Sequence, residues 1–143
     1  MTDRGGEDAQ SWRERRRRAS AFHAESVNRQ RQSESERARA LVERFVDQAK
    51  ARGIQPEPLL ARSYSSPARY RTGLSGWYIR KDRSVAIGVD GQYYVLTAPG
   101  GVKARLRGVH LTPDPPPLVV GLGARDGESR ELADLLNDVL QRG

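Results

Sequence analysis

The sequence contains no cysteine, only two histidines and a single methionine, and these absences limit the chemistry that it can carry. Without cysteine there is no disulfide, no thiolate metal site and no cysteine nucleophile. Neither His23 nor His110 has a second residue at metal-ligand spacing. We therefore expect no cofactor and no bound metal, and we expect a protein that is not an enzyme.

Long apolar runs are also missing. The sequence has no stretch of about 18 apolar residues, the length that a membrane-crossing helix needs. The arginines at 15–18 are not followed by the apolar segment of a secretion signal, because His23, Glu25, Asn28 and Arg29 interrupt any apolar run. These features predict a cytoplasmic protein with no integral membrane association.

Positive charge is plentiful and unevenly distributed. The formal net charge is +7, and residues 108–143 contain more acidic than basic side chains. In residues 62–107 the only acidic side chains are Asp82 and Asp90, whereas the basic ones are Arg62, Arg69, Arg71, Arg80, Lys81, Arg83, Lys103, Arg105 and Arg107. A concentration of one sign of charge is typical of proteins that bind polyanions.

The first third of the chain has the composition of a helix. Residues 7–52 contain neither glycine nor proline, and apolar side chains at helical spacing occur only near the end, at Leu41, Val42, Phe45, Val46 and Ala49. This pattern predicts a packed helix over residues 36–52, ended by Gly53. Residues 1–35 are then a charged arm, helical or disordered, because a helix without packing is marginally stable. The remaining residues, 36–143, are expected to form a single domain.

Short β-rich runs fill the second half of the chain. Three prolines make residues 54–76 a predicted connector, and strands are expected at 77–81, 85–89, 93–97, 102–107 and 118–120. Asp90-Gly91 predicts a two-residue hairpin turn. A final helix is expected with five apolar residues on one face, Leu132, Leu135, Leu136, Val139 and Leu140. The predicted fold is α+β, an antiparallel β-meander of four to five strands packed on one face by two helices.

The expected turns fix a register for this meander. Val89 would pair with Gln92, and the face toward the helices would then collect the apolar side chains Trp77, Ile79, Val85, Ile87, Val89, Tyr94, Leu96, Val102, Ala104 and Leu106. The polar face would carry Tyr78, Gly88, Tyr93 and Arg105 in one cross-strand row, with Arg80 and Lys103 beside it. Two tyrosines with neighbouring cations are typical of surfaces that bind single-stranded nucleic acid. The tyrosines would also serve merely to cover the bare backbone at Gly88. In a third interpretation the connector, the arm or a partner covers this face.

Together these patterns predict a non-enzymatic binding protein that engages RNA or another polyanion. The alternative is a protein–protein adaptor or regulatory subunit whose N-terminal arm folds on a partner, with no nucleic-acid role. The candidate binding residues come from the sheet face and from the arm. They are Tyr78, Arg80, Tyr93, Lys103, Arg105 and Arg107 in the domain, and Arg15, Arg16, Arg17 and Arg18 in the arm.

Overall fold

The computed structural model describes residues 4–121 and 129–143, and within these ranges it contains three helices and a five-stranded sheet. The mixed helix and sheet content confirms that part of the prediction. The elements are α1 Arg4–Ala51, β1 Glu57–Ser63, β2 Arg69–Tyr78, β3 Val85–Gly88, β4 Tyr93–Val95, β5 Thr97–Ala98, α2 Val102–Arg107, β6 Val119–Val120, β7 Arg130–Glu131 and α3 Leu132–Arg142.

The chain divides into two compact units, Met1–Glu34 and Ser35–Gly143. Helix α1 runs through both. In the first unit its described side chains are exposed, with the exception of the half-buried Ser26, Val27 and Glu34. In the second unit Val42, Phe45 and Ala49 are buried. The helix ends where Gly53 adopts a positive φ of 71°, the conformation that favours glycine after a helix.

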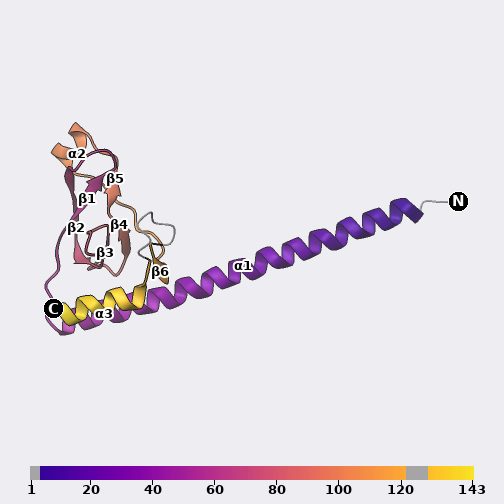
Figure 1. Ribbon diagram of the computed structural model, residues 1–143, viewed down its shortest axis with the longest axis horizontal. Coiled ribbons are helices and arrows are strands. Elements are labelled where there is room, and N and C mark those ends of the chain that lie inside the picture. Colours follow the sequence, from indigo (N-terminus) through magenta and orange to yellow (C-terminus); the bar gives the residue numbers. More distant parts are fainter. Residues whose placement is uncertain (1–3, 122–128) are drawn as a thin grey trace. The chain divides into compact units, whose positions relative to one another are not determined.

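The main core lies between the helices and one face of the sheet. Figure 1 shows α3 alongside the last turns of α1, below β2 and β3. The Phe45 and Trp77 rings pack at 89° to one another in a T-shaped pair, with centroids 5.6 Å apart, and the indole Nε1 of Trp77 donates to the Ile54 carbonyl at 3.0 Å. The buried residues from the helices are Ala38, Val42, Phe45, Val46, Ala49, Leu132, Leu135, Leu136, Val139 and Leu140, and those from the sheet are Trp77, Ile79, Val85, Ile87 and Tyr93, joined by Val120.

The sheet has the strand order β4-β3-β2-β1-β5. Because β4 and β5 are separated only by Leu96, the same stretch of chain pairs with β3 at one end and with β1 at the other. The amide of Leu96 donates to the carbonyl of Ser84, and its carbonyl accepts from the amide of Arg62, both at 2.8 Å. The sheet therefore curls until its two ends meet at Leu96.

This curled sheet encloses a second, smaller core. Its buried residues are Leu59, Ala86, Tyr94 and Leu96, and the half-buried Leu74, Tyr78 and Leu111 pack against them. Gly76 allows the close approach of β2 to β3, because a Cβ there would lie 2.1 Å from the carbonyl oxygen of Ile87. Leu96, which the predicted register assigned to the helix-covered face, lies in this second core.

Three predictions about the strands were wrong. The predicted connector contains β1 and most of β2, since apolar side chains alternate there despite the prolines and serines. The sheet is not a purely antiparallel meander, because β1 and β5 are parallel. The predicted strand at 102–107 is the helix α2, whose Lys, Ala, Arg and Leu residues all favour helix and which lies between Gly101 and Gly108.

Candidate functional site

The β3–β4 turn decides where the tyrosines lie. Gly88 and Gln92 form the last pair, with the amide of Gly88 donating to the Gln92 carbonyl at 2.9 Å, so the turn has three residues and not two. Only Gly91 has a positive φ, 79°, whereas the predicted two-residue turn needs positive φ at both positions. Asp90 instead accepts the Gln92 amide at 3.0 Å. Pairing therefore slips by one residue, and a one-residue slip moves each β4 side chain to the other face.

As a result, the predicted row of two tyrosines does not exist. Tyr93 pairs with Ile87 and is buried in the main core, whereas Tyr78 pairs with Ala86 on the opposite face. The Tyr78 hydroxyl accepts the Leu60 amide at 2.8 Å, and the guanidinium of Arg83 lies 5.4 Å from the centre of its ring. Arg105 lies on α2 and not in a strand. The open tyrosine platform is therefore contradicted by the geometry.

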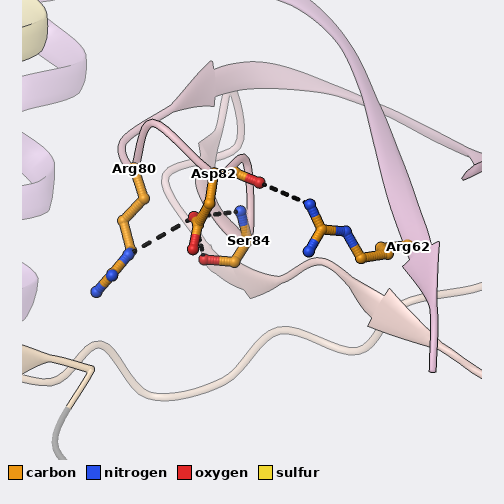
Figure 2. Close-up of polar contacts among 4 residues, drawn as sticks. All are labelled: Arg62, Arg80, Asp82 and Ser84. Carbon is orange, nitrogen blue, oxygen red and sulfur yellow. Dashed lines mark hydrogen bonds and ion pairs between the residues drawn. The ribbon is translucent and has the colours of Figure 1, made fainter. Parts of the chain in front are cut away.

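Arg80 lies in the β2–β3 turn, in a network centred on Asp82 (Figure 2). The Asp82 carboxylate accepts from the Ser84 hydroxyl at 2.6 Å and from the Ser84 amide at 3.1 Å, and it lies 3.6 Å from Nε of Arg80. Arg62 reaches the Asp82 carbonyl from β1 at 3.3 Å. Burial alone raises the pKa of the Asp82 carboxyl, but Ser84 and the two arginines outweigh it and hold that pKa below its usual value.

This turn and α3 form the walls of a charged cleft of about 700 Å³. Ile79 and Leu135 are apolar lining residues, and the charged ones are Arg80, Lys81, Asp82, Arg130, Asp138 and Arg142. Asp138 forms an ion pair with Arg130 at 2.7 Å. The cations of the cleft thus lie near carboxylates of the same cleft, and these carboxylates lower the attraction of the cleft for an anion from solution.

The other predicted cations of the domain gather at α2, at the end of the sheet far from α3 and the last turns of α1 (Figure 1). Lys103, Arg105 and Arg107 are exposed on α2. The C-terminal end of α2 and the chain that follows it are joined to β2, since Arg71 Nη2 donates to the Leu106 carbonyl at 3.4 Å and the Val109 amide donates to the Arg71 carbonyl at 2.8 Å. We call Arg69, Arg71, Lys103, Arg105 and Arg107 the basic cap.

The segments that form the basic cap carry no acidic residue. Neither residues 58–81 nor residues 91–113 contain aspartate or glutamate, and no ion pair involves a cap residue in the part of the chain that the structure describes. Sequence reasoning missed Arg69 and Arg71 because it treated 54–76 as a connector. The signal that points to them is the acid-free stretch 58–81, which contains both arginines, whereas α2 lies in the second acid-free stretch, 91–113.

Exposed apolar side chains accompany these cations. Val102 and Leu106, one helical turn apart on α2, are 76% and 72% exposed, and Tyr64 in the β1–β2 turn is 71% exposed. Ala104 is the buried residue of α2. Tyr64 is therefore the exposed aromatic ring of the β1–β2 end of the sheet, in place of the half-buried Tyr78 and the buried Tyr93.

In the first unit, Arg15, Arg16, Arg17 and Arg18 are exposed on α1. Successive helical residues are rotated by about 100°, so these four side chains surround the helix and do not share one face. The guanidinium of Arg16 lies 4.9 Å from the centre of the Trp12 ring, and Arg15 Nε donates to the Ser11 carbonyl at 3.4 Å.

No family model, curated protein or solved structure matches this chain. Among the described residues, no group of three or more acidic or histidine side chains is arranged to hold a metal ion. The helices within residues 4–121 and 129–143 are all too polar or too short to cross a bilayer.

Proposed function

We propose that this protein is a non-enzymatic binding protein that engages RNA, a polyanion, through the basic cap and through Arg15–Arg18 of α1. The observation that carries the proposal is the basic cap, where five exposed cations lie on two elements in contact, β2 and α2, whose segments contain no carboxylate. Phosphates that approach such a surface meet no repulsion from aspartate or glutamate and release their condensed counterions.

The side chains beside the cations support a single strand as the form of RNA. An exposed tyrosine ring offers a base a stacking surface, worth about 1–3 kcal/mol per base, and Tyr64 is such a ring. The four arginines around α1 would add phosphate contacts that carry no sequence preference.

The test compares two triple variants that lose the same charge. Lys103→Gln, Arg105→Gln and Arg107→Gln together should weaken binding of a fluorescently labelled single-stranded RNA and lower the salt slope by up to about 3, because each phosphate contact contributes about 1. The control is Arg37→Gln, Arg39→Gln and Arg44→Gln, three exposed α1 positions outside the cap. Fluorescence anisotropy over a range of salt concentrations measures both. Equal effects of the two triples, or no binding by the unaltered protein at low salt, would contradict the proposal.

A second candidate function is a protein–protein adaptor that binds its partner through the N-terminal arm. The exposed Trp12 and Phe22 on α1 favour it, since large apolar side chains are common where proteins meet. Absence of RNA binding at low salt would favour this adaptor function over RNA binding.

A further inference from the structure

An open pocket of about 350 Å³ lies between the β1–β2 turn and α2, next to the basic cap. Its polar side chains are hydroxyls and one guanidinium, and none of its lining residues is acidic. The lining residues are Ser63, Ser65, Ser66, Ala68, Tyr70, Gly100, Gly101, Val102 and Arg105.

The hydroxyl oxygens in this pocket already accept hydrogen bonds from the backbone. Tyr70 accepts the Gly101 amide at 3.3 Å, Ser63 accepts the Ser65 amide at 3.3 Å, and Ser66 accepts the Ala68 amide at 3.3 Å. A hydroxyl whose oxygen accepts an amide still has its proton to donate. One proton is shared between Ser63 and Ser65, whose oxygens lie 3.5 Å apart, and the structure records no acceptor for those of Tyr70 and Ser66 among the residues it describes. The pocket therefore offers donors to a ligand, which selects for an anion.

Gly100 keeps the two walls of this pocket close together. A Cβ at this position would lie 2.5 Å from the Tyr70 hydroxyl oxygen and 2.6 Å from Oγ of Ser63. Both of those residues are buried, at the ends of paired strands, so neither moves aside easily. The glycine thus allows the hydroxyls to sit against the backbone that leads into α2.

We propose that this pocket binds a phosphate group of the RNA, with Tyr70 and Ser66 donating hydrogen bonds and Arg105 supplying the opposite charge. The proposal rests on the proposed function and adds a defined phosphate site to it. A guanidinium with several hydroxyl donors and no carboxylate fits the tetrahedral oxygens and negative charge of phosphate. The phosphate is either a terminal monoester or an internal diester.

The experiment uses the full chain and one RNA sequence with a 5′-phosphate or a 5′-hydroxyl. Tyr70→Phe and Arg105→Gln should each weaken binding about ten-fold, because a hydrogen bond to a charged group is worth roughly one decade in affinity or more. The matched controls are Tyr94→Phe, which removes the hydroxyl of a buried tyrosine outside the pocket and the basic cap, and Arg44→Gln, which removes the same charge from an exposed α1 position outside the cap. Both controls should change affinity by less than about three-fold, since an exposed charge contributes little beyond its share of the salt slope.

The two RNAs identify the source of the phosphate. If the pocket holds a terminal monoester, the unaltered protein prefers the 5′-phosphate and Tyr70→Phe abolishes the preference. If it holds an internal diester, Tyr70→Phe weakens both RNAs equally. Ser66→Ala, at an exposed position, repeats the test without touching a buried side chain, and the thermal midpoint of each variant verifies folding.

The failure of this site and the failure of RNA binding are distinguishable. If the unaltered protein binds RNA but the pocket variants weaken it no more than Tyr94→Phe and Arg44→Gln do, the pocket proposal is overturned and the proposed function stands. If the unaltered protein binds neither RNA at low salt, both are overturned.

Discussion

At the scale of residues, two adjacent tyrosines occupy opposite faces of the sheet and both are buried. Burial, together with the nearby charge of Asp114, raises the pKa of Tyr93 to about 12. Burial also raises the pKa of Tyr94 to about 12, and there the hydrogen bond from its hydroxyl to Asp90 Oδ2, at 2.6 Å, acts in the same direction. Each phenol is therefore held neutral in the folded state.

This predicts a loss of stability in alkali. An unfolded tyrosine loses its proton near pH 10, whereas Tyr93 in the folded protein retains it to about pH 12. Its contribution is thus complete below about pH 10, and the free energy of unfolding should fall as pH rises from there to about pH 12. The free energy of unfolding of the Tyr93→Phe variant, measured by urea unfolding, should fall less steeply with pH over this window. Tyr64→Phe, at an exposed position, is the control. If the unfolding free energies of Tyr93→Phe and the unaltered protein fall equally steeply with pH, the raised pKa of Tyr93 is contradicted.

The sequence predicted these residues only in part, for a physical reason. The alternation of Trp77, Ile79, Val85 and Ile87 identified one apolar face, and these four residues do share the main core. Tyr93 and Tyr94 are both large and amphipathic, so alternation does not distinguish which of them points inward. Which tyrosine points inward depends on the length of the turn. A two-residue turn would require a positive φ at Asp90, but the Asp90 side chain accepts the Gln92 amide and the turn has three residues.

At the scale of elements, α2 shows the limit of a period-two pattern over six residues. Alternating apolar and basic residues predicted a strand at 102–107, yet the same residues have high helix propensity and lie between two glycines. The longer patterns, in α3 and the last part of α1, contain enough turns to identify a helix. For the candidate site, the sequence identified the cations of α2. Their grouping with Arg69 and Arg71 could not be predicted, because those two residues lie in the part of β2 that was expected to be a connector.

Truncation of a leucine side chain should have a large effect on stability in α3 and a small one in α2. Leu135→Ala in α3 removes a side chain from the main core and should cost about 2–5 kcal/mol of unfolding free energy. Leu106→Ala in α2 removes an exposed side chain and should change it by less than about 0.5 kcal/mol. Denaturant unfolding measures both. A cost for Leu106→Ala equal to that for Leu135→Ala would mean that α2 packs its apolar side chains in solution.

At the scale of the whole molecule, the buried apolar side chains among the described residues all come from the second unit. The first of them along the chain is Ala38. The first unit contributes Arg15–Arg18 and the exposed Trp12 and Phe22, which are residues suited to binding and contribute no buried side chain to either core.

Deletion of residues 1–30 should therefore leave the thermal midpoint nearly unchanged, because none of the side chains described in that range is buried. The same deletion should weaken RNA binding and reduce its salt dependence, since Arg15–Arg18 are removed. Circular dichroism on heating and anisotropy measure the two effects. A fall of many degrees in the midpoint would show that the arm stabilises the fold.

The closure of the sheet at Leu96 also bears on self-association. An open sheet presents unpaired amides and carbonyls along its outer strands, which invite a strand from another molecule. Here β4 is continued by β5, which pairs back onto β1, and the Asp114 amide donates to the carbonyl of Tyr93 at 2.9 Å on the outer side of β4. The pairs of β6 and β7 are only two residues long. Few backbone groups of these strands are therefore left to pair with a strand of another molecule. The exposed surface of the β1–β2 turn and α2 can then remain open to a ligand without promoting self-association through the sheet edge.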